Sequence, residues 1–302
     1  MVNTGLKKLF KGYIANIASA GLAGSVFVLG ISSASAAALS GNIEGVLDAS
    51  GSPYQVISNL TVASGKTLTI QPGVVLLINP GVGVTVNGAL ITAGTQAEPV
   101  IITSSQDGEA GGSGAGAGGQ WGVLQFTNSS GAQLANTIVR FGQKVGLTNS
   151  SPQFNNVTVA TMSVAAITAD LTSFPSGAGN SSFGSPVNGI DLPSGGVSQN
   201  NTWGLVGIPY IIRSGDVSVG ISGSRLTIAP GVIIKLLNSR LQNIGALTAV
   251  GTAEAPIVFT SYYDDTVGGD SNQDNGVTAP GRGNWRDVQL AGAGTSGSRL
   301  EH

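Results

Sequence analysis

Short runs of β-branched and aliphatic residues, each bounded by a turn signal, recur along most of the chain. Valine, isoleucine, threonine and phenylalanine dominate these runs, and they are the residues enriched in buried strands. Asn-Pro, Asn-Gly, Pro-Gly and Gly-Thr pairs between the runs indicate turns. No segment of helical period with capping residues follows residue 40, so the sequence predicts an all-β fold. The pattern predicts strands at residues 67–70, 74–78, 82–86, 100–103, 123–126, 137–141 and 157–159.

Three architectures are built from many short strands. A sandwich or barrel alternates hairpins, and a propeller repeats in blades of about forty residues. A parallel β-helix instead stacks short strands coil on coil. Continuous apolar runs such as residues 74–78 (VVLLI) fit a parallel sheet better than a hairpin with one solvent-facing side. The irregular strand spacing therefore favours the parallel β-helix.

Within that architecture, alternate residues of each strand point into the coil. We expect these inward positions to form an aliphatic core that runs from coil to coil. The predicted inward residues are Leu68, Ile70, Val75, Leu77, Leu90, Ile101, Leu226, Ile228, Ile233, Leu247 and Ile257.

A long internal repeat organises the chain. Residues 88–104 (GALITAGTQAEPVIITS) return as residues 245–261 (GALTAVGTAEAPIVFTS), an offset of 245 − 88 = 157 positions. The block LTIxPG occurs at residues 68–73 and again at residues 226–231. A unit this long exceeds one solenoid repeat, so each copy should contain several coils.

The repeat predicts two β-helix modules. The first covers residues 50–206, and the second covers residues 207–302 and is truncated relative to the first. A lead-in of residues 37–49 precedes them. Because the second module stops where the first continues into further coils, we expect the natural polypeptide to continue past His302 with more β-helix coils.

Residues 1–36 have the organisation of a secretory signal peptide. Lys7, Lys8 and Lys11 form a basic start, residues 26–31 are mostly apolar, and an Ala-Ser-Ala cleavage signal ends at Ala36. The alternative is a retained membrane anchor, but glycine, serine and alanine dilute the apolar run. We therefore expect an exported protein, secreted or at the cell surface, whose mature chain does not span a membrane.

Composition excludes several function classes. The formal net charge is −2, which gives no electrostatic basis for binding nucleic acid. There is no cysteine, and the only histidine is His302, so disulfides, thiolate sites and histidine-based catalysis are excluded. We expect no catalytic residue and no organic cofactor. The basic residues are scattered and predict solvated positions with no basic patch; they are Arg140, Lys144, Arg213, Lys235, Arg240 and Arg286.

The blocks LTIxPG, GxLxAxGTxxxPIxFTS, a following tryptophan and GSxLEH together resemble the bacterial right-handed parallel β-helix family with the pectate-lyase-like fold. The resemblance covers residues 50–302 and is closest to modules of secreted and surface-anchored proteins. It implies a right-handed solenoid with an aliphatic core, stacked side chains and projecting loops. Polysaccharide-cleaving members carry clustered carboxylates, and no such cluster is evident in this sequence.

One loop resembles a calcium-binding sequence. Asp270, Asn272 and Asp274 place oxygen ligands at every second residue, as calcium loops do. The match is incomplete, because the glycine comes one position late at Gly276 and no acidic residue closes the loop. The alternative is a polar, glycine-rich insertion between strands. Calcium is accordingly the one metal that we consider.

Other candidate features have structural explanations. Trp121 and Trp285 could stack on sugars, but their equivalent repeat positions favour a role at the edge of the coil. Residues 108–119 (GEAGGSGAGAGG) form a glycine-rich insertion that lacks the lysine of a phosphate loop. Two functions follow: a structural or binding module that adheres to a polysaccharide or a surface partner, or a polysaccharide lyase or hydrolase of the pectate-lyase-like fold. Fold alone supports the enzyme.

Overall fold

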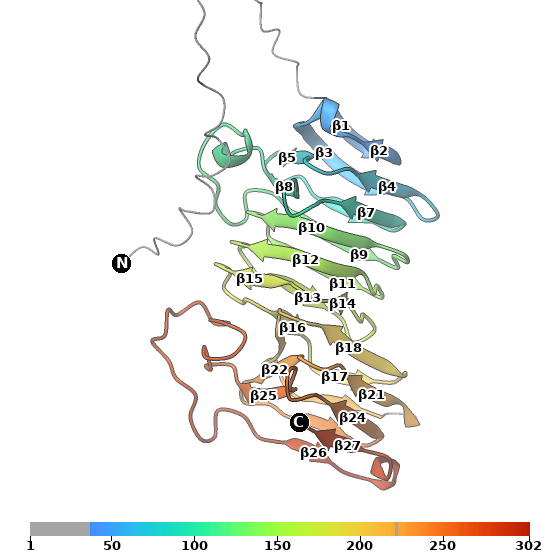
Figure 1. Ribbon diagram of the computed structural model, residues 1–302, viewed down its shortest axis with the longest axis vertical. Helices are drawn as coiled ribbons and strands as arrows, with labels where there is room; N and C mark the ends of the chain where they lie inside the picture. The colour runs from blue at the N-terminus through green and yellow to red at the C-terminus, as the bar shows by residue number, and fades with distance from the viewer. Residues whose placement is uncertain (1–36, 221–222) are drawn as a thin grey trace, which may run out of the picture. The chain divides into compact units, whose positions relative to one another are not determined.

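A computed structural model describes residues 37–220 and 223–302. The predicted signal peptide lies outside the described residues. Apart from short 3-10 turns, the regular elements are β-strands, and every strand pairing among them is parallel. The strands form stacked coils (Figure 1), which confirms the predicted all-β parallel β-helix. In the described part of the chain, no helix is both long and apolar enough to cross a membrane.

Three long sheets run along the stack, and consecutive strands of the chain pass from one sheet to the next. The first sheet contains, in spatial order, β3 (Tyr54–Val62), β5 (Val75–Ile78), β8 (Val100–Ser104), β10 (Gln133–Arg140), β12 (Gln153–Ala160) and β15 (Ser181–Phe183). β1 (Ala38–Asn42) pairs with β3 at its edge.

The second sheet starts from the far half of β3. It continues through β6 (Val84–Val86), β9 (Val123–Thr127), β11 (Lys144–Thr148), β13 (Ile167–Ala169), β16 (Ile190–Leu192), β19 (Tyr210–Ile212), β22 (Ile233–Leu236) and β25 (Val258–Ser261). The third sheet contains β2 (Gly45–Leu47), β4 (Thr67–Ile70), β7 (Ala89–Ala93), β10, β12, β14 (Ser176–Gly177), β18 (Asn201–Leu205), β21 (Arg225–Ile228), β24 (Ala246–Val250) and β27 (Arg299–Glu301).

One coil contains four strands in place of three. After this coil, some strands that are equivalent in the sequence repeat lie in different sheets. β15 is the last described strand of the first sheet, and β17 (Gly195–Val197) begins a fourth sheet with β20 (Val217–Val219), β23 (Leu241–Asn243) and β26 (Val288–Leu290). β5 and β22 are equivalent in the sequence repeat, yet β5 lies in the first sheet and β22 in the second. The duplication was visible in the sequence, but this shift was not.

The core follows the predicted aliphatic stack in most coils. Leu68, Ile70, Leu90, Leu226 and Leu247 are at most 2% exposed, as predicted. Ile228 is buried in the same way. These side chains join one continuous cluster that extends through the described coils.

The predicted register was wrong in three strands. Val75, Ile101 and Ile233 are only half-buried, because they point outward. Their neighbours Ile102 and Ile234 are the buried inward residues. Apolar runs such as residues 74–78 have no polar alternation, so the sequence pattern could not distinguish one register from the other.

Two further predicted core residues lie elsewhere. Leu77 is 3% exposed but does not belong to the core cluster, because it lies on the outer face of β5. Ile257 is partly buried and packs against the core from outside any described strand.

Asparagine and serine residues form the corners of the coils. Asn136 and Asn156 have φ angles of 44° and 55°, and each lies where β10 or β12 bends from the third sheet into the first. Asparagine tolerates this left-handed conformation better than most residues. At another corner the hydroxyl of Ser150 accepts from the backbone N–H of Ser129, and the hydroxyl of Ser173 accepts from that of Ser150. These side chains satisfy backbone donors at the turns.

Candidate functional site

The most polar part of the surface is a loop inserted between β25 and β26. Residues 262–287 leave the coil and fold back over the outer face of the second sheet (Figure 1); we call this segment the acidic strap. Tyr262 anchors its start in a small apolar cluster with Ala165, Val187 and Ile211. The start of the strap therefore joins a cluster whose earliest member precedes Tyr262 by 262 − 165 = 97 residues.

Asn188 fixes the middle of the acidic strap. Its backbone N–H donates to the carbonyl oxygen of Ser271 (2.9 Å), and its side-chain amide donates to the carbonyl oxygen of Asp270 (2.7 Å). The hydroxyl of Tyr262 also donates to the carbonyl of Ser271 (3.1 Å). The strap is thus held by apolar packing and by directed hydrogen bonds.

Lys235 lies beneath the strap and is fully buried. Its Nζ donates to the carbonyl oxygens of Asp264 (2.7 Å) and Gly269 (2.6 Å). Burial lowers the pKa of Lys235, and the nearby charge of Asp265 opposes that shift. The expectation that Lys235 would be solvated was wrong, because the inserted strap covers the face of β22 on which it lies.

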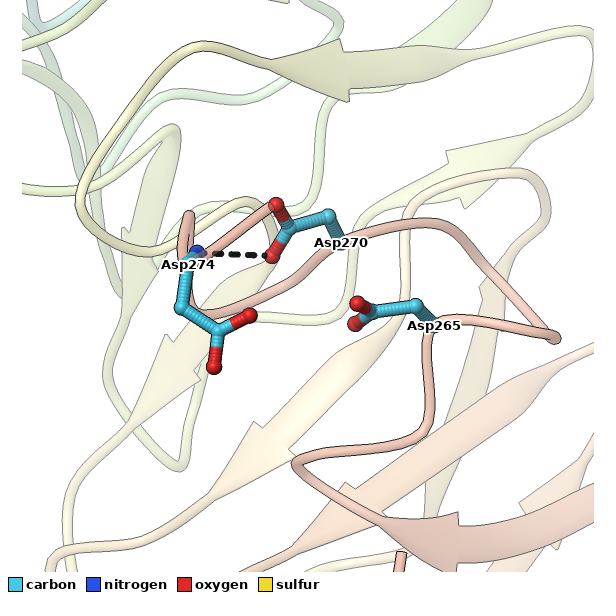
Figure 2. Close-up of side chains that lie close together, drawn as sticks. All are labelled: Asp265, Asp270 and Asp274. Atoms are coloured by element: carbon cyan, nitrogen blue, oxygen red, sulfur yellow. Dashed lines mark hydrogen bonds between the residues drawn. The ribbon is translucent and has the colours of Figure 1, made fainter. Parts of the chain in front are cut away.

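Three carboxylates of the strap converge. One oxygen each from Asp265, Asp270 and Asp274 lies within 4.8 Å of the other two. Figure 2 shows Asp265 facing the other two side chains across the strap. The sequence pattern included Asp270 and Asp274 but missed Asp265, which lies outside the alternating motif and joins it only because the strap folds back.

Backbone donors orient two of the three carboxylates. Asp270 accepts from the N–H groups of Asp274 (3.2 Å) and Asn275 (2.9 Å). Asp274 accepts from the N–H groups of Gly276 (2.9 Å) and Thr278 (2.9 Å). The hydroxyl of Thr278, followed by further hydrogen bonds, lowers the pKa of Asp274. Asp274 is therefore ionised and rigidly placed.

Asp265 lacks such support. Its Oδ1 is buried and has no hydrogen-bond partner among the described residues. Burial, followed by the negative charges of Asp270 and Asp274, raises the pKa of Asp265. A buried carboxylate oxygen without a donor is costly unless a cation satisfies it.

The amide nitrogen of Asn272, the third predicted ligand, is hydrogen-bonded, whereas its amide oxygen is not, among the residues that the structure describes. Its amide nitrogen donates to Asp274 Oδ2 (2.7 Å) and to Thr278 Oγ1 (2.9 Å). Its amide oxygen is buried without a hydrogen-bond partner in the described structure. Carboxylate and amide oxygens are the ligands that calcium takes in proteins. The three carboxylates Asp265, Asp270 and Asp274 therefore fit a calcium ion, and Asn272 Oδ1 is a buried oxygen in the same loop, unpartnered among the described residues.

A second insertion occupies the equivalent place in the first repeat. Residues 105–122 between β8 and β9 form a glycine-rich strap, as the sequence indicated. A Cβ atom at Gly112 would lie 2.6 Å from the carbonyl oxygen of Ser105, so glycine is required where this strap turns back on itself. Beneath it, Arg140 Nε pairs with Asp107 at 2.7 Å, and both side chains are buried. Arg140 is therefore a second exception to the expectation of solvated cations.

The two straps begin in the same way. Thr103 Oγ1 donates to Asp107 Oδ2 (2.6 Å), and Thr260 Oγ1 donates to Asp264 Oδ2 (2.5 Å). These pairs are separated by the repeat offset, since 264 − 107 = 157. The hydrogen bonds from Thr260 and Thr266 lower the pKa of Asp264. Alignment of the repeats could have identified both aspartates as structural residues.

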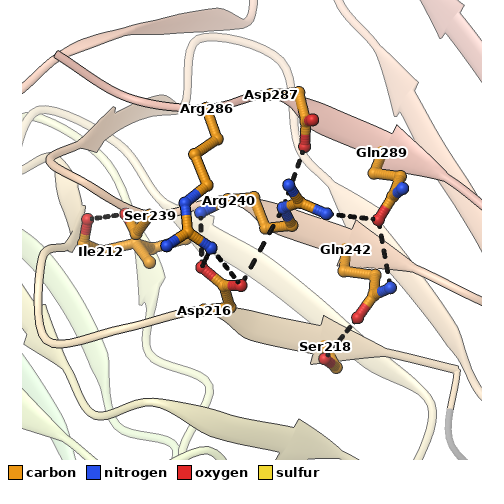
Figure 3. A network of polar contacts seen from close by, with 9 residues as sticks. All are labelled: Ile212, Asp216, Ser218, Ser239, Arg240, Gln242, Arg286, Asp287 and Gln289. Carbon is orange, nitrogen blue, oxygen red and sulfur yellow. Dashed lines mark hydrogen bonds and ion pairs between the residues drawn. The ribbon is translucent and has the colours of Figure 1, made fainter. Parts of the chain in front are cut away.

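The outer face of the fourth sheet carries a charge-balanced network (Figure 3). Arg240 Nε lies 3.3 Å from Asp287, and its Nη1 donates to Gln289 (3.0 Å). Arg286 pairs with Asp216 at 3.1 Å. The two arginines are neutralised within the network, which links neighbouring coils without creating a basic patch.

The tryptophans differ in exposure. Trp121 is fully buried, and its Nε1 donates to the carbonyl oxygen of Arg140 (2.8 Å). Its ring is therefore a coil-edge core residue and presents no platform to a sugar. Trp285 is partly buried and packs against the core cluster.

A groove of about 460 Å³ lies on the second sheet where Asp170 and Asp191 come from neighbouring coils. Both carboxylates have partners. Asp191 receives two hydrogen bonds from Arg213 (3.0 and 2.8 Å), and Asp170 accepts from the N–H groups of Asn149 and Thr172.

No protein-family model, curated protein or solved structure matches this chain. The class of protein is therefore defined by the fold itself, a parallel β-solenoid with two straps inserted at equivalent positions of a sequence repeat.

Proposed function

We propose that the chain is an exported structural and binding module of a secreted or cell-surface protein, with adhesion to a glycan or to another surface as its role. The observation that supports this most is the combination of a continuous parallel stack with two straps inserted at equivalent positions of the sequence repeat. Such a stack provides a stiff support, and inserted loops are where binding residues concentrate on rigid folds. The basic start and cleavage signal before Ala36 support export.

The acidic strap contributes a calcium site in this proposal. Asp265, Asp270 and Asp274 supply three negative charges within reach of one ion, and the same loop holds the amide oxygen of Asn272, which has no partner in the described part of the chain. Bound calcium would satisfy the buried oxygen of Asp265 and offset the repulsion among the carboxylates. The ion would therefore stabilise the strap in one conformation, which is what a loop that presents a binding surface needs.

Polysaccharide cleavage is the second candidate, and the groove with Asp170 and Asp191 favours it. Paired carboxylates are the usual machinery of glycoside hydrolysis. Here, however, Arg213 engages Asp191, and backbone donors engage Asp170. Both carboxylates are already engaged by donors within the protein, an arrangement that suits binding better than proton transfer to a leaving group.

A glycan-array screen of the purified chain, run with calcium and with chelator, tests the proposal. We expect selective retention of at least one glycan class. A parallel assay for reducing sugar or unsaturated product on acidic polysaccharides separates the two candidates. Product release that is lost in Asp170→Asn would replace the binding module with the enzyme, whereas an array without any specific signal would contradict glycan adhesion.

A further inference from the structure

A second groove crosses the outer face of the third sheet at β14, β18 and β21, away from both straps. It encloses about 400 Å³, a volume typical of small-molecule sites. Its lining combines one aromatic ring, three hydroxyl groups, the two amides of Asn200 and Asn201 and a guanidinium group, and contains no acidic residue. The residues that matter are Phe174, Ser176, Asn200, Thr202, Arg225 and Thr227.

Small side chains in register form the floor of this groove. Thr202 of β18 pairs with Thr227 of β21, and Ser176 of β14 pairs with Gly204 of β18. Neighbouring strands lie about 4.8 Å apart, so these hydroxyl groups recur regularly along the stack. Phe174 is half-buried and packs against the core, so its ring forms a wall that cannot swing away freely.

Arg225 is the unusual member of the lining. Five of the seven arginines form ion pairs: Arg140, Arg213, Arg240, Arg286 and Arg299. Arg225 forms none with any described residue, although it is not loose. Its Nη1 donates to Thr248 Oγ1 of the neighbouring strand β24 (3.1 Å), which fixes one end of the guanidinium group while Arg225 lines the groove. A placed but unneutralised guanidinium group is suited to an anion, because it offers several charge-assisted donors at once.

We propose that this groove binds one sugar residue of an anionic glycan. Its carboxylate or sulfate lies at Arg225, the apolar face of its ring lies against Phe174, and its hydroxyl groups bond to Thr202 and Thr227. The proposal rests on the proposed binding function and gives it a site. A polysaccharide laid along the stack would present successive sugars to successive coils, since the coils repeat their hydroxyl groups at a fixed spacing.

Isothermal titration of the full chain tests the proposal with three probes of equal length: a uronic-acid oligosaccharide, a sulfated oligosaccharide and a neutral one. We expect a charged probe to bind more tightly than the neutral probe, and Arg225→Gln to weaken it by about tenfold. Phe174→Leu, which keeps Arg225, should lower the affinity for every probe that binds. Arg282→Gln is the matched control, because Arg282 is exposed in the acidic strap and also forms no ion pair with a described residue.

The outcomes separate this groove from the broader function. Charged-probe binding that survives both Arg225→Gln and Phe174→Leu overturns the groove while leaving glycan adhesion supported. Absence of binding by the unaltered chain to all three probes overturns both. Loss of affinity in the two groove variants but not in Arg282→Gln supports the site, and the preferred probe identifies carboxylate or sulfate as the anion. Unchanged melting temperatures exclude misfolding as the cause of any loss.

Discussion

Leu77 and Lys235 occupy the same position of the sequence repeat, 235 − 77 = 158 residues apart, and both are buried on the outer face of a sheet. Each lies on a strand, β5 or β22, that pairs with the strand immediately before an inserted strap, β8 or β25. Leu77 belongs to the repeat that carries the glycine-rich strap. Lys235 instead donates to two carbonyl oxygens of the acidic strap. Between the two repeats, both the residue at this position and the inserted strap are therefore different.

Replacement of Lys235 tests this relation. Lys235→Met keeps most of the apolar stem but leaves the carbonyls of Asp264 and Gly269 without their donor. We expect unfolding to be easier by about 2–3 kcal/mol, the cost of unsatisfied buried polar groups. Trypsin should also cut faster after Arg282, which lies in the strap. Lys66→Met, at an exposed pair with Glu44, is the control and should change neither property. Equal melting and cleavage in both variants would show that Lys235 does not hold the strap.

Calcium should raise the melting temperature of the chain. At a free concentration one hundred times the dissociation constant, mass action adds about 2.7 kcal/mol. Asp265→Asn should abolish this gain. Without calcium the same variant should melt at or above the unaltered chain, because it removes a carboxylate that burial and two neighbouring charges disfavour.

Two controls complete the calcium experiment. Glu254→Gln, at an exposed position outside the strap, should keep the full calcium response. The double variant Asp270→Ala and Asp274→Ala should lose the response and also melt earlier, since these side chains accept backbone hydrogen bonds. If millimolar calcium does not change the melting temperature of the unaltered chain, the acidic strap is a polar loop and not a calcium site.

Adjacent isoleucines of β8 test the register. Ile102 points inward and is 1% exposed, so Ile102→Ala should cost about 2–5 kcal/mol. Ile101 points outward and is half-buried, so Ile101→Ala should cost clearly less. The two variants delete the same atoms from neighbouring positions, and urea unfolding compares them directly. A larger loss in Ile101→Ala would reverse the assigned register.

The buried pair under the glycine-rich strap makes a fourth prediction. Asp107→Ala removes the buried carboxylate from the Arg140 guanidinium group, and loss of one partner of such a pair costs about 3–5 kcal/mol. Glu109 also contacts Arg140, at 3.2 Å, but its side chain is 67% exposed. Glu109→Ala should therefore have little effect on unfolding by urea. Similar losses in the two variants would show that burial does not set the strength of this pair.

Strand existence and parallel stacking were predictable because turn signals and β-branched runs are local properties of the sequence. Register was not, since residues 74–78 and 100–102 are apolar on both faces. Outer-face positions can be buried where an inserted strap covers the sheet, as the contacts of Lys235 with the acidic strap show. An inserted loop thus removed the alternation on which register assignment depends.

The candidate site was only partly predictable for a similar reason. Asp270 and Asp274 lie close in sequence, and a local motif identified them. Asp265 joins them through the fold of the strap, which depends on Asn188, a residue 270 − 188 = 82 positions before Asp270. The buried state of Lys235 was accessible only by comparing the repeats, where Leu77 stands in its place.

The reach of the acidic strap also changes how the stack should come apart. In an ordinary solenoid each coil contacts only its neighbours, so unfolding spreads from an end one coil at a time. Here Asn188 and Tyr262 tie non-adjacent coils together through Ser271. The coils between these two residues cannot fray singly while that tie holds, and they form one cooperative block. The amides of β16, β19 and β22 should accordingly exchange with a single opening free energy, which is the free energy needed to detach the strap and open these coils together.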